Sequence, residues 1–262
     1  NHMGAAIAAA HTIFNISNVI ILTPFVSLLD KFLLFAVKDT GEDEVRVTKL
    51  ASLKMTLPSV IIEQTKIEVS SMVTMIENVF LKLEEALKEK EKIAKYNDSI
   101  VEAEDKLDLY EKEIYDSNFS LLSKSLSKEL IEDTRMNLLT CDEYETIGDY
   151  QNRIANRLYM LYENSIELDE TRAKMTFKLH SLVVELFNDI SRAARTGEKE
   201  LYSAGIKKYQ TLKTYYKEVK REHFFRSENI PARLNTGYLD IINYYKRIAD
   251  HIYNIIEYVM KI

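Results

Sequence analysis

The sequence has little of what β-sandwiches, disulfide frameworks and disordered chains need. Its 262 residues include 6 glycines, 3 prolines, 1 cysteine and no tryptophan. A single cysteine forms no intrachain disulfide and builds no cysteine-rich zinc site, which fits a reducing compartment. Scarce glycine and proline, with 46% hydrophobic and 29% charged residues, are typical of long helices. We therefore expect an all-α protein.

A surplus of positive charge is also missing. The formal net charge is −6, and the lysines and arginines are interleaved with acids, which argues against a general nucleic-acid binder. The six glycines are scattered, so no phosphate-binding loop is formed. Cys141 has the character of a small helix residue, and no nucleophile converges with a base. The sequence therefore favours a protein that is not an enzyme and binds no nucleic acid.

Charged residues are absent from the first 29 positions. The apolar stretch from Gly4 to Leu29 is long enough to cross about 30 Å of hydrocarbon as a helix. His11, Asn15 and Asn18 within it suit a helix that packs among others. Two interpretations stay open: the last intramembrane segment of a larger membrane protein, or a buried or domain-swapped helix of a soluble one.

Basic residues follow this stretch at positions 31, 38, 46, 49 and 54. On the membrane interpretation, the positive-inside rule places the chain after about residue 39 in the cytoplasm of a protein of the cell membrane. We take residues 1–39 as the membrane segment. Residues 40–57, which include an acidic stretch beside Gly41, form the predicted linker.

From Leu57-Pro58 onward the apolar spacing is helical, with proline at the first turn of a helix. Six amphipathic helices follow, which predicts an antiparallel helical bundle. One of them ends at Gly197, a natural left-handed cap. Ile147-Gly148-Asp149-Tyr150 and Ile248-Ala249-Asp250-His251 lie 101 residues apart at matching places in their helices. We therefore predict two three-helix repeats, 58–165 and 168–262.

Polar stripes run along the third and sixth helices of the bundle. Asp142, Glu145 and Asp149 recur at helical spacing on the third, and Asp250, Asn254 and Glu257 form a stripe on the sixth. Oxygen-rich helix faces attract hard cations, although the same spacing also occurs on ordinary solvated faces. Both interpretations stay open. Gly148 inside its helix indicates a close approach to the backbone.

Glu145-Thr146-Ile147-Gly148-Asp149 and Arg247 to Asn254 resemble the twin metal-binding motifs of PhoU-like proteins. The resemblance implies two three-helix repeats. The segment Ala10 to Phe25 is similar to the closing intramembrane segment of bacterial sodium/phosphate cotransporters that carry a PhoU-like tail. Leu57 to Lys66 is similar to the start of that tail.

Each motif departs from the family pattern at one position. Lys246 replaces the acid expected four residues before Asp250, and Arg153 replaces the asparagine expected four residues after Asp149. The resemblance then implies one shared divalent or iron-type metal ion, or none. The residues predicted to hold it are Glu145, Asp149, Asp250 and Asn254, with Asp142 and Glu257 as further members of the polar stripes.

By resemblance, the chain is the cytoplasmic regulatory domain of a sodium-dependent phosphate transporter. It would modulate phosphate uptake through ion binding or through protein partners, a second copy of itself included. The alternative is a structural or scaffolding helical bundle that dimerises and has no link to transport.

Overall fold

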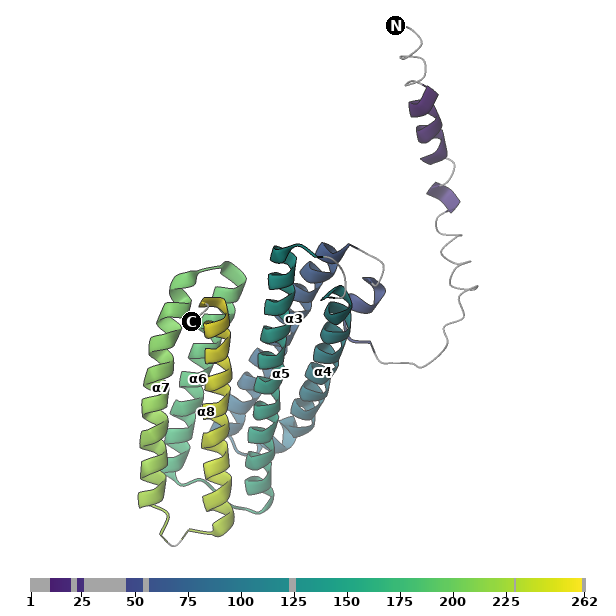
Figure 1. Cartoon of the computed structure of the whole chain (residues 1–262). Helices are drawn as coiled ribbons and strands as arrows, with labels where there is room; N and C mark the ends of the chain where they lie inside the picture. Colours follow the sequence, from purple (N-terminus) through teal and green to yellow (C-terminus); the bar gives the residue numbers. More distant parts are fainter. Residues whose placement is uncertain are drawn as a thin grey trace. The chain divides into compact units, whose positions relative to one another are not determined.

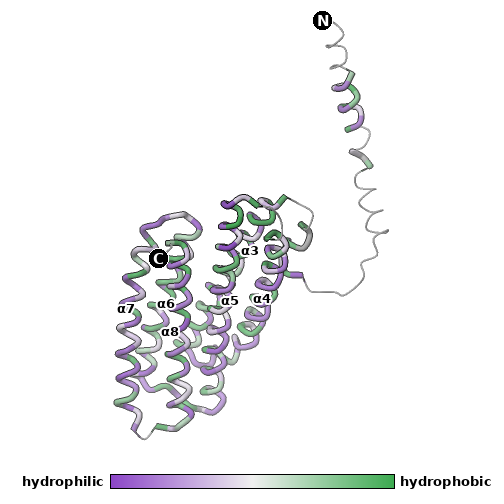
Figure 2. Tube along the Cα trace, viewed as in Figure 1, coloured by the Kyte–Doolittle hydropathy of each residue, from purple (hydrophilic) through white to green (hydrophobic). Residues whose placement is uncertain are grey.

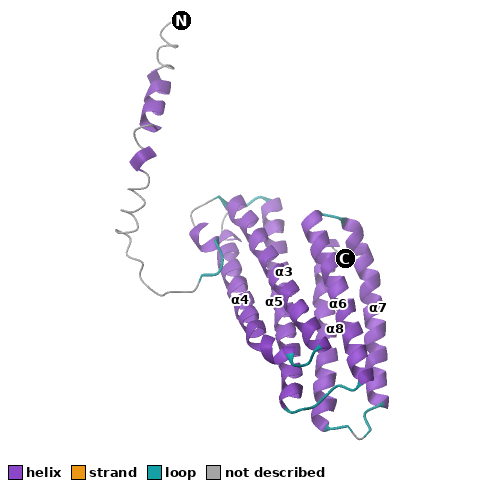
Figure 3. Cartoon of the chain, turned by 180° about the vertical axis from the view of Figure 1, so that it is seen from behind, coloured by secondary structure: helices purple, strands orange, loops and turns teal. Residues whose placement is uncertain are grey.

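A computed structural model describes residues 10–19, 23–25, 46–53, 57–122, 126–228 and 230–260. The chain divides into two units, Asn1–Val45 and Arg46–Ile262. Within the described ranges the structure is built from α-helices and short 3-10 turns and has no strand (Figure 3). The all-α prediction is therefore confirmed.

The first unit has two described segments. Residues 10–19 are α-helical, and Thr23–Phe25 (η1) is a 3-10 turn. The rest of the predicted membrane segment 1–39 lies outside the described residues. Among the helices that the structure describes, none combines the length and apolar character that crossing a bilayer needs.

The second unit contains the two predicted three-helix repeats (Figure 1). The first consists of α3 (Pro58–Lys88), α4 (Lys92–Leu122) and α5 (Lys128–Glu163). The second consists of α6 (Glu170–Thr196), α7 (Lys199–Phe225) and α8 (Ala232–Met260). Successive helices run up and down, and α5 packs directly against α8 where the repeats meet.

Local sequence sets the helix ends. Pro58 occupies the first turn of α3, as predicted. The hydroxyl of Ser127 accepts a hydrogen bond from the Leu130 backbone N–H and caps α5, and the Asp169 carboxylate caps α6 in the same way. Gly197 ends α6 with φ 74°, the left-handed conformation predicted for it.

Apolar faces of all six helices form one continuous core, and Figure 2 shows apolar and polar positions alternating along each helix. At its centre, the rings of Phe80 and Phe187 pack edge to face with centroids 5.3 Å apart. The Nδ1 atom of His180 lies 3.0 Å from the Tyr245 hydroxyl. Burial lowers the pKa of His180 to about 4, so this imidazole is neutral at physiological pH.

Part of the predicted linker is packed against the bundle. Its residues 40–45 and 54–56 lie outside the described part, whereas 46–53, with the 3-10 turn Leu50–Leu53 (η2), contact α3 and α4. The Glu113 carboxylate of α4 accepts hydrogen bonds from the backbone N–H groups of Val47 at 2.8 Å and Thr48 at 2.9 Å. Glu68 of α3 accepts one from Lys49 at 3.1 Å. Leu50 is 1% exposed, so we name residues 46–53 the docked strap.

Candidate functional site

The structure separates the predicted metal residues into three places. Glu145 and Asp149 point from α5 toward α4, and Asp250 on α8 contacts α7. Asn254 on α8 contacts α5 instead. The two motifs are therefore not brought together into one shared cluster.

The carboxylates of α5 face a second row of carboxylates on α4. We name this group the acidic seam; its members are Glu104, Asp108 and Glu111 of α4 and Asp142, Glu145 and Asp149 of α5. Only Asp149 has a cation within 4.0 Å among the described residues: Arg153, at 2.8 Å. The other five carboxylates face one another without a basic partner in that part of the chain.

Burial and mutual repulsion shift the proton affinity of the seam. Partial burial is the main cause that raises the pKa of Glu145 to about 7, and the negative charge of Glu111 adds to it. The negative charge of Asp108 on α4 raises the pKa of Glu145 further. Burial also raises the pKa of Glu111, with a contribution from Asp142. The seam therefore favours a bound proton or another positive charge.

Gly148 explains how two acidic helices approach so closely. A Cβ atom at this position would lie 2.2 Å from Cδ1 of Leu107 on α4, well inside van der Waals contact. The sequence predicted a close approach to this backbone, and the approaching group is the buried side chain of Leu107. The tight apolar contact holds the two rows of carboxylates beside each other.

The second repeat carries different chemistry at the corresponding positions. The seam between α7 and α8 consists of Tyr209, Lys213 and Tyr216 of α7 and Asn243, Lys246 and Asp250 of α8. The three α8 residues lie 101 residues after the α5 residues of the acidic seam. The three α7 residues lie 105 residues after the α4 residues of the acidic seam. We name this group the Lys–Tyr seam; it retains one of the six carboxylates.

Contacts support this correspondence. Tyr209 donates a hydrogen bond to Asp250 at 2.8 Å, as its counterpart Glu104 interacts with Asp149. Tyr216 donates one to Asn243 at 2.6 Å. The ammonium of Lys246 lies 2.5 Å from Asp250. The charge of Asp250 is therefore neutralised by Lys246, one turn earlier on the same helix.

A third group of polar residues joins the repeats. Glu143 of α5 is 3% exposed, and its carboxylate lies 2.7 Å from Nδ1 of His251. It accepts hydrogen bonds from the Asn254 amide at 3.1 Å and the Tyr258 hydroxyl at 2.6 Å. We name Glu143, His251, Asn254 and Tyr258 the Glu143 cluster. Asn254 therefore lies at the joint between the repeats, away from the other predicted metal residues. Glu257, the remaining stripe residue, interacts electrostatically with Tyr258.

The sequence interpretation did not identify Glu143 or the acids of α4 as site residues. The signal was present as spacing. Glu104, Asp108 and Glu111 step by four and then three residues, and the α5 stripe steps by three and then four. Both are helical spacings, so pairing the two stripes would have indicated the seam. His251, Asn254 and Tyr258 share the same helical spacing on α8.

The oxygen donors of the acidic seam are the kind that hard cations prefer. Within the described ranges, however, no three His, Cys, Asp or Glu side chains are already arranged to hold one metal ion. Binding would require the half-exposed carboxylates to change rotamer. The metal site at Glu145 and Asp149 therefore stays a prediction.

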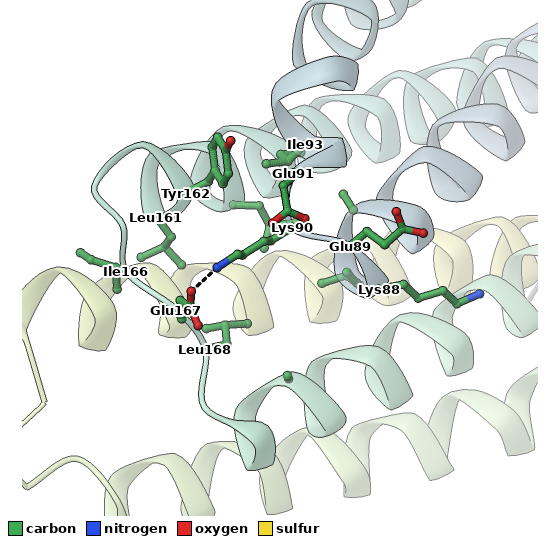
Figure 4. Close-up of a pocket in the computed structure, with 14 residues that line it drawn as sticks. Lys88, Glu89, Lys90, Glu91, Ile93, Leu161, Tyr162, Ile166, Glu167 and Leu168 are labelled. Carbon is green, nitrogen blue, oxygen red and sulfur yellow. Dashed lines mark hydrogen bonds and ion pairs between the residues drawn. The ribbon is translucent and has the colours of Figure 1, made fainter.

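A separate pocket of about 400 Å³ lies between the α3–α4 turn and the α5–α6 connection (Figure 4). Apolar side chains, among them Ile93, Leu161 and Ile166, line it. An ion pair between Lys90 and Glu167 joins the two connections beside it. None of the predicted site residues lines this pocket.

Comparison with known proteins identifies the fold and family. A family model described as the PhoU domain matches residues 69–158 and 177–259, one match in each repeat. The chain belongs to the PhoU domain family. The two matches contain the acidic seam and the Lys–Tyr seam respectively, so both seams belong to PhoU repeats. No curated protein matches the chain.

Two solved PhoU structures resemble this PhoU chain. One is the phosphate transport system regulatory protein PhoU from Streptococcus pneumoniae, with a TM-score of 0.67 and 19% identity over 78% of this chain and 95% of that one. The other is PhoU from Pseudomonas aeruginosa, with a TM-score of 0.68 and 18% identity over 76% and 94%. At this identity the likeness establishes the fold.

Proposed function

We propose that this PhoU chain regulates phosphate uptake by a sodium-dependent phosphate transporter and transforms no substrate. The observation that carries the proposal is the PhoU match on both repeats. A protein of the same fold is named a phosphate transport system regulatory protein. The uncharged stretch at positions 1–29 supports attachment to the cell membrane, with the bundle in the cytoplasm.

The proposed input is a cation at the acidic seam. Glu145 and Asp149 of α5, joined by Asp108 of α4, would hold a divalent or iron-type ion through their carboxylate oxygens. A bound cation neutralises the repulsion by Glu111, which adds to burial in raising the pKa of Glu145. Neutralisation would let α4 and α5 pack more closely, because like charges no longer oppose the contact.

The proposed output is the docked strap. Glu113, which binds the strap backbone, follows the seam residue Glu111 by two positions on α4. A shift of α4 relative to α5 would therefore move the anchor of the upstream chain as a rigid body.

Phosphate uptake measured in cells that carry the complete protein tests the regulatory role. We expect deletion of residues 58–262 to abolish the decrease of uptake at high external phosphate. The substitution pair Glu145→Gln and Asp149→Asn should weaken this decrease while the bundle stays folded. Uptake that responds to phosphate as before in the deletion strain would contradict the regulatory role.

Elemental analysis of protein purified without chelator tests the ion site. We expect bound metal in the wild type and its loss in Glu145→Gln/Asp149→Asn. The matched control is Lys246→Gln/Asp250→Asn in the second repeat, which should retain the metal. Equal metal content in the two double variants would exclude the acidic seam as the site.

A further inference from the structure

The acidic seam is followed by apolar side chains toward the end of the bundle where α4 ends and α5 begins. Beyond Glu111 the stripe on α4 continues with Tyr115, Phe119 and Leu122, at steps of four, four and three residues. Ile131 of α5 lies opposite Leu122, because the two helices run antiparallel in the register of the acidic seam. We name Tyr115, Phe119, Leu122 and Ile131 the apolar end patch.

All four side chains of the apolar end patch face solvent. Phe119 is 73% exposed, Ile131 45%, Leu122 43% and Tyr115 40%. Exposed apolar side chains that stand singly are ordinary, whereas a contiguous group of them marks a surface that another apolar phase covers. The apolar end patch is therefore a candidate contact surface.

The corresponding end of the second repeat does not reproduce the patch. The counterparts of its three α4 residues are Lys220, Phe224 and Ser227, and the counterpart of Ile131 is Ala232. Of these four positions, only Phe224 keeps a large apolar side chain. The packing of the fold therefore does not require apolar residues at these positions.

The upstream chain joins the bundle at the level of the patch. The docked strap is bound by Glu113, two residues before Tyr115 on α4. The inference rests on the membrane attachment in the proposed function, in which the membrane segment ends at about residue 39. From there to Arg46 the chain spans at most about 25 Å. An attached bundle therefore keeps the strap and the patch close to the lipid surface.

We propose that the apolar end patch contacts the lipid surface of the membrane to which the chain is attached. Phe119, Leu122 and Ile131 enter the boundary between headgroups and acyl chains. Tyr115 lies at the level where tyrosines are enriched in membrane proteins, between these residues and the carboxylates. The acidic seam begins one turn further along α4 and stays in water.

The contact needs neither anionic lipid nor strong intrinsic affinity. None of the four patch residues is charged, so a zwitterionic lipid surface is sufficient. A patch of this size binds weakly by itself, but attachment through the upstream chain gives it a high effective concentration at the surface. The contact would orient the bundle with the α4–α5 end toward the membrane.

A tryptophan at position 119 can report the contact, because the chain has no tryptophan of its own. The full-length Phe119→Trp chain is reconstituted with phosphatidylcholine vesicles that carry bromine on their acyl chains, which quenches an indole ring only on contact. We expect about twofold weaker emission than in vesicles without bromine. The matched control is Phe224→Trp, at a position that is also exposed, at 55%. Its emission should be the same in both lipids.

A second set of variants separates the patch from the attachment. Leu122→Glu/Ile131→Glu, added to Phe119→Trp, should remove the quenching, because carboxylates resist transfer into the lipid boundary. The control adds Ser227→Glu/Ala232→Glu, the same charge at the counterpart positions, and should leave the quenching unchanged. Circular dichroism verifies that each variant is helical.

Flotation of the chain with the vesicles distinguishes failure of the patch from failure of the attachment. A chain that does not float would overturn both. A chain that floats, with equal Phe119→Trp emission in the two lipids, would overturn the patch contact and leave the attachment standing. Equal quenching at positions 119 and 224, or quenching that survives the glutamate pair in the patch, would also overturn the patch contact.

Discussion

The first and second repeats share their helix order and differ in the chemistry of their outer seams. Glu145 and Asp149 face carboxylates of α4, whereas their counterparts Lys246 and Asp250 neutralise each other. The apolar core is continuous through both repeats. The buried apolar positions thus keep the same helix packing in both repeats. The half-exposed seam positions hold acid, lysine or tyrosine without a change of fold.

The joint between the repeats shows the same divergence. Glu143 faces His251 at 2.7 Å. The counterparts of these two residues, Tyr244 and Tyr150, also face each other, as tilted rings with centroids 5.7 Å apart. The duplicated geometry therefore persists where one pair is ionic and the other aromatic. This contrast predicts where a substitution is costly and where it is tolerated.

The largest expected effect is at the Glu143 cluster. Glu143→Ala should lower the free energy of unfolding by about 3 kcal/mol, because it removes a buried carboxylate and leaves the half-buried donors of His251, Asn254 and Tyr258 without their acceptor. Urea denaturation measures the change. The control at the counterpart position, Tyr244→Phe, keeps the ring contact and should cost about 0.5 kcal/mol or less. Equal costs would show that the two halves of the joint are energetically alike.

The next effect is at the glycine of the acidic seam. Gly148→Val should destabilise the protein by about 2 kcal/mol, because its side chain collides with Leu107. The counterpart in the second repeat is Ala249, already buried with a Cβ atom. Ala249→Gly should cost about 1 kcal/mol or slightly more, through lower helix propensity and the loss of a buried methyl group. A stabilising Gly148→Val would mean that α4 and α5 are free to separate.

The smallest effect is a pH dependence that separates the seams. The pKa of Glu145 is about 7 in the folded chain against an ordinary 4.5, so the folded state binds this proton more tightly. Protonated Glu145 therefore contributes its full stabilisation to the folded state below pH 4.5, the ordinary pKa. This contribution is lost as the pH rises through about 7.

Unfolding free energies at pH 5 and pH 8 measure this loss. Relative to Glu145→Gln, the wild type should lose about 1 kcal/mol more between the two values, since solvent screens a half-exposed group. Lys246→Gln, at the matched position of the second repeat, should follow the wild-type dependence. A wild type and a Glu145→Gln variant with the same pH dependence would contradict the shifted pKa.

The helices, their caps and the duplication follow from local spacing, so the sequence was sufficient to predict them. Pro58 and Gly197 act through their own backbone conformation, and Gly148 was correctly read as a point of close approach. Each of these signals lies within a few residues of the feature it determines.

The contacts between helices could not be predicted in the same way. The stripe containing Glu145 indicates a polar face but does not say which helix faces it. The strap was taken as a linker because its partners Glu68 and Glu113 lie 19 and 65 residues further along the chain. Glu143 was overlooked because its partners are more than 100 residues away. Only the packed bundle reveals such distant pairs.

The docked strap also sets where an isolated bundle can begin. A fragment starting at residue 57 would lack Leu50, whose burial contributes about 2 kcal/mol, and would leave an apolar depression on α3 and α4 open to water. Glu68 and Glu113 would lose the backbone N–H groups that they bind. A recombinant fragment of the bundle should therefore start at Arg46.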